Sequence, residues 1–390
     1  MTINVMLDGS AVSIDAAVFE ELFEQSVVND RVGVRRARAR SEIKFRDLVE
    51  LARVAEIPYP LFFAPMDVVA EQLRIKNQKL MAGFTKTCFS MNSRDRVHLP
   101  DIELIIRDLI RKQEYLKQDT TLVKNPIVGC LKRSRGSVAE DAEALMVALD
   151  VSRDQLRASP TKERALELLI SKLEARQILV SRSVRNHMPQ SMPKRAKFSG
   201  LTLKDSKVPY IFLSSGEGDG LEPAGRRVFT LTLLTVLIAR GVFAPVTYDG
   251  HTKDETATRE YELTAQVLMP AAEMRETSFR SLDDVRRASD HCKVTPSAIV
   301  MRARRLGLLD RDTAGGYLDE LAEEFARRER VHRKSPRPVD AQKKYNGLEC
   351  SRRMLRLLDS GHMNAAEFCR VMFANRLRPA QIYEFRMAVR

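Results

Sequence analysis

The sequence predicts a mainly helical α+β protein, and three observations support this fold class. Most of the chain places apolar residues at helical spacing. A strand-like stretch with turn residues occurs at 201–215 (LTLKDSKVPYIFLSS). No run of about 18 uninterrupted apolar residues is present, so a membrane-spanning helix is not expected. A chain of 390 residues is long enough for two or three packed domains.

The first part of the chain, residues 1–65, is expected to form short helices and a turn. Residues 16–27 are amphipathic, and the segment 45–57 repeats apolar residues at helical spacing before Pro58 ends it. Between them lies a run of basic residues: Arg35, Arg36, Arg38, Arg40 and Lys44. A basic turn between two short helices suits a helix-turn-helix that faces phosphate. The alternative is a small helical subdomain with a solvated basic face.

Residues 66–190 are expected to form a helical linker domain. The segment 101–118 carries isoleucines and leucines along one stripe. Ser137 followed by Glu140 is a capping-box pattern, which predicts that a helix begins there. These apolar stripes are interpreted as packing surfaces.

Residues 191–310 change in character, and 311–390 form an extension. After a connector and the strand-like stretch we expect an apolar helix at Arg226–Ala239, a helix that ends at Pro270, and two short helices within 281–309. The segment 326–345 predicts a mobile basic linker, and two amphipathic helices follow it.

The segment order resembles the ImmA/IrrE family of zincin-like metallopeptidases. KFRDLVELARVAEIPYPLFFAP is similar to the end of the Xre-type helix-turn-helix that precedes this domain, and KFSGLTLKDSKVPYIFLSS to the family's strand pair. RRVFTLTLLTVLIARG stands where the family has Arg, then Phe-Thr-Leu, then the zinc-binding HExxH helix. YELTAQVLMP and VTPSAIVMRARRLGLL are similar to its two closing segments. The resemblance covers about residues 40–310 and implies a zincin-like domain at 191–310.

The sequence departs from the family at the zinc site. The HExxH positions hold Leu233, Leu234 and Leu237. HExxH chemistry needs two imidazoles on one helical face to bind zinc, and a glutamate to accept a proton from the bound water. Leucines supply neither a lone pair nor a base. The resemblance therefore implies a pseudopeptidase that binds no metal and no other cofactor. It also implies an incomplete helix-turn-helix, because VRRARARSEIKF stands where the family has its usual Trp-Glu-x-Gly turn, so phosphate contacts are expected and base-specific reading is not.

Two sets of polar residues keep an alternative open. The family's third zinc ligand is an acidic residue on the later helix, where Glu260 and Glu262 are nearest. His251, Asp254, Glu255 and Glu260 lie close in sequence and are the residues from which an unconventional site can be built. The chain has six histidines but no H-x-x-x-H pair.

Charge and cysteine content restrict the partners and the compartment. Lys and Arg number 65 against 52 Asp and Glu, a net charge of +13, which favours an acidic or polyanionic partner unless the whole proteome is basic. The absence of Trp argues against base stacking on single strands. Five scattered cysteines without a CxxC pair predict reduced thiols in a cytoplasmic protein. The first ten residues show no secretory signal.

Four functions follow as hypotheses. The first is a non-catalytic, antitoxin-like regulator that binds a toxin or a repressor-like protein, for which the tail helices offer an apolar surface unless they pack on the chain itself. That surface comprises Met354, Leu355, Leu357, Leu358, Phe368, Val371, Met372 and Phe373. The second is a DNA-binding transcriptional regulator of a mobile or phage-related locus. The third is an active metallopeptidase with an unconventional site, and the fourth is a structural subunit.

Overall fold

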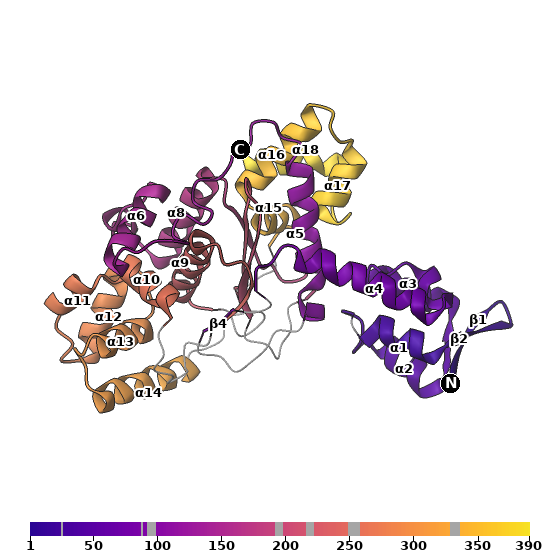
Figure 1. The fold of residues 1–390 in the computed structure, drawn as a ribbon, viewed down its shortest axis with the longest axis horizontal. Coiled ribbons are helices and arrows are strands. Elements are labelled where there is room, and N and C mark those ends of the chain that lie inside the picture. Colours follow the sequence, from indigo (N-terminus) through magenta and orange to yellow (C-terminus); the bar gives the residue numbers. More distant parts are fainter. Residues whose placement is uncertain are drawn as a thin grey trace. The chain divides into compact units, whose positions relative to one another are not determined.

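The computed structural model describes residues 1–24, 26–86, 89–91, 99–191, 198–215, 222–248, 258–327 and 336–390 (Figure 1). About 60% of the protein is helical and its sheets are small and mixed, which confirms the mainly helical α+β class. Contacts divide the chain into two compact units. The first comprises Met1–Gly83, Val97–Ile110 and Pro189–Pro193, and the second comprises Phe84–Arg96, Arg111–Met188 and Lys194–Arg390.

The first unit combines a three-stranded sheet with helices. Its strands are β1 (Thr2–Leu7), β2 (Ser10–Asp15) and β3 (Glu42–Lys44), in the order β2-β1-β3. Its helices are α1 (Ala16–Glu24), α2 (Val32–Arg40), α3 (Phe45–Val54), η1 (Tyr59–Phe63), α4 (Met66–Met81) and η2 (Leu99–Asp101), with α5 (Glu103–Leu116) as far as residue 110.

The β1–β2 hairpin depends on its two-residue turn. Asp8 and Gly9 have φ values of 45° and 86°. Two consecutive left-handed residues match the right-handed twist of paired strands, which is why Asp-Gly favours such a turn. The hairpin was not predicted, because only Ile3, Val5 and Ile14 of its strands are buried and the pattern is short.

The first unit closes around aromatic side chains. The predicted amphipathic helix at 16–27 is confirmed as α1, which buries Phe19 and Phe23. Phe62 from η1 joins them, with its ring centroid 4.7 Å from that of Phe23. Offset and edge-on ring pairs of this kind add specificity to the apolar core.

The second unit is built on a mixed five-stranded sheet. Its strand order is β4-β8-β6-β7-β5, with antiparallel β6–β7 and β6–β8 pairs and parallel β4–β8 and β5–β7 pairs. The strands are β4 (Phe89–Met91), β5 (Leu179–Arg182), β6 (Phe198–Leu203), β7 (Tyr210–Leu213) and β8 (Pro245–Tyr248). The predicted strand-like stretch at 201–215 is confirmed as the second half of β6 together with β7.

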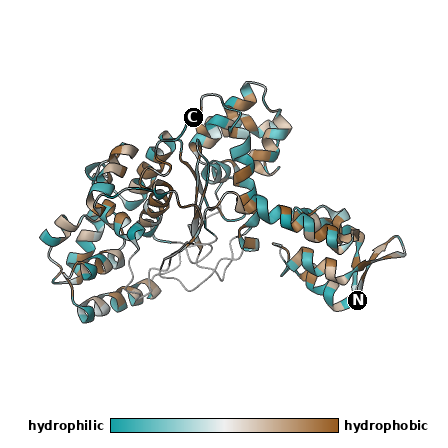
Figure 2. Ribbon diagram, viewed as in Figure 1, coloured by the Kyte–Doolittle hydropathy of each residue, from teal (hydrophilic) through white to brown (hydrophobic). Residues whose placement is uncertain are grey.

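Helices make up most of the rest of the second unit. They are α6 (Val138–Leu149), α7 (Arg153–Arg157), α8 (Lys162–Ala175), α9 (Ala224–Arg240), α10 (Arg259–Leu268), α11 (Ala271–Glu276), α12 (Leu282–His291), α13 (Pro296–Arg305), α14 (Arg311–Arg327), α15 (Pro338–Asn346), α16 (Leu348–Asp359), α17 (Ala365–Phe373), η4 (Pro379–Gln381) and α18 (Ile382–Val389). The predicted capping box is confirmed, since the Ser137 hydroxyl accepts from Glu140 N–H and the Glu140 carboxylate accepts from Ser137 N–H. Apolar residues concentrate around α9 and the strands beside it (Figure 2).

The two units do not follow the predicted domain borders at residues 65 and 190. The apolar stripes of α6 and α8 enter the same core as α9 and α10. Residues 138–175 are thus integral to the packing of α9 and α10, because α9 needs their apolar faces to cover it.

The predicted basic linker at 326–345 is wrong at both ends. Its first residues belong to α14, which extends to Arg327, and its last residues form α15. The interval 328–335 lies outside the described residues. Helix α15 was not predicted because its sequence is mostly polar. Its buried apolar residues are Val339, Ala341 and Tyr345.

A glycine substitution tests the approach of α9 to α13. A Cβ on Gly225 would lie 2.5 Å from the Val294 carbonyl carbon, whereas a Cβ on Gly315 in α14 meets nothing within 4 Å. We expect Gly225→Ala to lower the free energy of unfolding by about 1–3 kcal/mol. Gly315→Ala should raise it by about 0.5–1 kcal/mol because alanine favours a helix. Urea unfolding followed by circular dichroism measures both; equal effects would refute the close approach.

Candidate functional site

Helix α9, where the resemblance predicts a zinc site, is buried on all sides. Its residues from Val228 to Ala239 are all buried, although they include three threonines. A helix that is apolar all round belongs in a core. Two of those threonines, Thr232 and Thr235, donate their hydroxyls to carbonyls four residues earlier, so α9 absorbs these polar groups internally.

The three leucines at the HExxH positions are packing residues. Leu233, Leu234 and Leu237 are each 0% exposed. Leu234 Cδ1 lies 2.9 Å from where a Cβ of Gly200 would stand, so the side chain presses directly on β6. Each leucine buried to this extent stabilises the fold by about 1.5–3 kcal/mol. The space that a metal and a water molecule need is filled by hydrocarbon.

The described residues around α9 include no donor set for zinc. Among the described residues, no group of three His, Cys, Asp or Glu side chains is arranged to hold a metal ion. Of the four residues that suggested an unconventional site, the structure describes only Glu260. His251, Asp254 and Glu255 lie outside the described residues. Glu260 Oε1 lies 3.7 Å from Arg240 Nε, at the end of α9. That carboxylate therefore neutralises an arginine.

Glu262 is likewise part of an ion pair. It lies 2.6 Å from Arg302 Nη1, and Arg302 is 2% exposed. The same guanidinium donates to Gln266 and to the Met269 carbonyl, which ties the end of α10 to α13. Breaking such a buried pair leaves an uncompensated charge, so these residues act in structure.

The predicted basic residues lie on a helix, and the predicted turn is wrong. Arg35, Arg36, Arg38 and Arg40 belong to α2, which the buried Val34 and Ala37 anchor. Ser41, in the left-handed conformation, ends α2, and the short strand β3 separates it from α3. Helix α2 was not predicted because only two of its residues are buried, which is too few to give a helical pattern of apolar residues.

The structure separates these basic residues into two kinds. Arg38 is half-buried, pairs with Glu20 of α1 at 2.7 Å and donates to Asn29. It therefore holds α2 against α1. Arg35, Arg36, Arg40 and Lys44 are exposed and make no ion pair within the described ranges. We call the three arginines Arg35, Arg36 and Arg40 the α2 basic face; Lys44 lies on β3. Unneutralised cations on one short surface attract polyanions.

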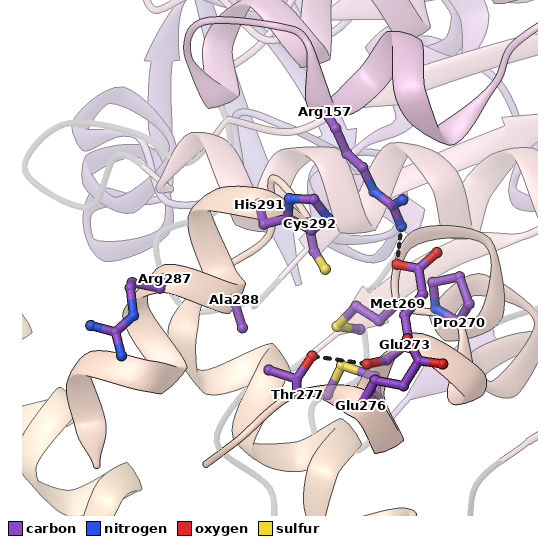
Figure 3. Close-up of a pocket in the computed structure, with 11 residues that line it drawn as sticks. Arg157, Met269, Pro270, Glu273, Glu276, Thr277, Arg287, Ala288, His291 and Cys292 are labelled. Atoms are coloured by element: carbon purple, nitrogen blue, oxygen red, sulfur yellow. Dashed lines mark hydrogen bonds and ion pairs between the residues drawn. The ribbon is translucent and has the colours of Figure 1, made fainter. Parts of the chain in front are cut away.

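A cavity that the sequence did not indicate lies beside α10, α11 and α12. Its volume is about 450 Å³, and Figure 3 shows the Cys292 thiol near it together with the Arg157–Glu273 ion pair. Burial raises the pKa of the Cys292 thiol to about 11. A thiol with that pKa carries almost no thiolate at neutral pH, so it is no nucleophile. Met269 and Met274 give the cavity an apolar floor.

The tail helices do not offer the predicted apolar surface. Seven of its eight residues are buried and Leu358 is partly buried, mainly against α15–α18. Phe368, Phe373 and Phe385 of this bundle form a ring cluster, with centroids of Phe373 and Phe385 4.8 Å apart. The alternative that these helices pack on the chain itself is therefore confirmed.

No protein-family model, curated protein or solved structure matches this chain. The ImmA/IrrE resemblance thus stays a prediction from the motifs quoted above.

Truncating a leucine of α9 tests whether the helix is a packing element. We expect Leu237→Ala to lower the free energy of unfolding by about 2–5 kcal/mol, because it leaves a cavity in the core. The control is Val147→Ala in α6, where the side chain is 78% exposed and the change should stay within about 0.5 kcal/mol. Denaturant unfolding measures both, and a small loss for Leu237→Ala would show that α9 is loosely packed.

Proposed function

We propose that this chain is a non-catalytic regulatory protein that acts by binding. The observation that carries the proposal is the burial of Leu233, Leu234 and Leu237 at 0% exposure within α9. A catalytic site needs groups that reach substrate and water, and these positions reach neither. Strands β6 and β7 and helices α8 and α10 nevertheless pack around α9, and an intact frame around a filled site is what a binding scaffold requires.

The proposed partner is a protein, such as a toxin or a repressor-like factor, held in an antitoxin-like manner. Most exposed large apolar side chains among the described residues lie in the first unit: Met1, Leu7, Val12, Val32, Tyr59, Phe63 and Val68. Aromatic and aliphatic side chains at the surface are typical of protein interfaces. The first unit therefore supports this proposal better than the tail helices do.

We place the protein in the cytoplasm. The described cysteines Cys130, Cys292 and Cys369 are free thiols, as a reducing compartment favours. None of the described helices has the length and apolar character to cross a membrane.

Metal content and proteolysis test the absence of catalysis. The purified protein should carry substoichiometric zinc, because leucines offer no ligand, and should leave candidate protein partners uncut. Elemental analysis and incubation with proteins captured from the native host measure this. Stoichiometric zinc that Glu260→Ala removes would overturn the proposal and favour a peptidase with an unconventional site.

Binding of DNA is a second candidate function, and the α2 basic face supports it. Arginine and lysine side chains neutralise phosphates and release counterions, so such binding weakens as salt rises. Ala39 is exposed beside Arg40 on α2, and the major groove of duplex DNA is wide enough to admit an α-helix. A regulator that binds a protein can also bind its own promoter region.

Charge removal at α2 tests this second function. The triple change Arg35→Ala, Arg36→Ala, Arg40→Ala should weaken binding to duplex DNA and reduce the slope of log affinity against log salt by about 2–3. Arg38→Ala should instead lower stability by about 1 kcal/mol through loss of the Glu20 pair. Fluorescence anisotropy at several salt concentrations measures binding.

The matched control removes the same charge elsewhere. Arg164, Arg275 and Arg280 are exposed arginines of the second unit, and their replacement by alanine should leave DNA affinity nearly unchanged. If both triple variants lose affinity equally, the net charge and not the α2 basic face drives binding.

A further inference from the structure

We propose that the buried carboxyl of Glu174 is a proton-sensitive latch that holds the C-terminal helices α15–α18 on the sheet, more tightly when it is protonated. This inference is independent of the proposed function. It concerns one junction within the second unit, where the end of α8 meets β5 and the corner between α15 and α16.

Glu174 supplies the N-terminal cap that α16 lacks. The N-cap residue of α16 is Gly347, which has no side chain to accept a hydrogen bond. Glu174, 6% exposed near the end of α8, accepts from the Leu348 N–H at 3.1 Å. The first N–H groups of a helix have no partner within the helix, so a carboxyl brought from another element stabilises its start.

The chain turns at Gly347, between α15 and α16, in close contact with the Glu174 carboxyl. Gly347 has φ of +77°, and a Cβ there would lie 2.5 Å from Glu174 Oε1 and 2.5 Å from the Val180 carbonyl oxygen. Beside it, Ser181 donates its hydroxyl to the Tyr345 carbonyl at 2.6 Å. The α15–α16 corner therefore cannot leave β5 without exposing the Glu174 carboxyl to water.

Few charges stabilise an ionised Glu174. Arg182 from β5 acts on it but is already paired with Glu167, and Glu349 from α16, a like charge, is paired with Arg353 at 2.7 Å. Burial outweighs these effects and raises the pKa of Glu174 to about 7. A carboxyl released from this junction would return toward its ordinary value of 4.5.

The direction of the pH effect follows from linkage. Between pH 4.5 and about 7 the docked corner binds a proton that the released corner does not. Docking is therefore strongest at low pH, and it weakens as pH rises through this range. Above about 7 a buried anion remains in the docked form.

One neighbouring group acts in the opposite direction. His187, whose carbonyl accepts from Gln342 of α15, has its pKa lowered by burial and by Arg376. Its protonation weakens docking as pH falls below 6.5. The two titrations overlap, so separate variants are needed to distinguish them.

Hydrogen exchange in the full-length protein tests the latch. Exchange of the first-turn amides of α16, corrected for the intrinsic effect of pH, should be on the order of tenfold faster at about pH 8 than at about pH 5.5, since each pKa unit corresponds to a factor of ten. Glu174→Gln should remove the faster exchange at the higher pH, because the amide cannot ionise, and leave only the opposite effect of His187. His187→Gln should steepen the pH dependence.

Glu163→Gln, an exposed change at the start of α8, is the matched control and should behave like the wild type. Equal pH dependence in wild type and Glu174→Gln would overturn the proposal. Carbon NMR of the Glu174 carboxyl in the unmodified protein decides independently of any variant. Titration near pH 7 supports the latch, and titration near pH 4.5 overturns it.

Discussion

The second unit depends on covering α9 from every side. Strands β6 and β7 lie against this helix, as do α8 and α10, and glycines at two contacts leave no room for a side chain. Gly225 lets the start of α9 approach the backbone before α13, and Gly200 lets Leu234 reach the sheet. Because interiors are packed to crystal density, the elements that cover α9 hold one another in place.

Local patterns predicted much of this fold. Helical spacing of apolar residues identified α1, α3, α5, α9 and α10, and the Ser137–Glu140 pair located the start of α6, since these signals lie within a few residues of one another. Strands β5 and β8 were missed because their partners are distant in sequence and a strand buried on both faces shows no alternation.

The candidate sites were predictable only in part. The family pattern placed three leucines where ligands would stand, and their burial agrees with a packing role. By contrast, nothing local distinguishes Arg38 from Arg35. That difference arises from Glu20, 18 residues away, which half-buries one guanidinium and leaves the other in solvent. The cap of α16 depends on Glu174, 174 residues before Leu348, and no sequence motif links the two.

The filled centre of α9 also limits how this protein can evolve. Installing a histidine or glutamate at Leu233, Leu234 or Leu237 would bury an unsatisfied polar group, at a cost of about 1–3 kcal/mol or more for each. Stability of a domain is typically about 5–15 kcal/mol in total. Each intermediate would lose stability before the complete ligand set could gain a metal. Stepwise mutation toward a metal site on this helix therefore meets a stability barrier unless the surrounding core is rebuilt first.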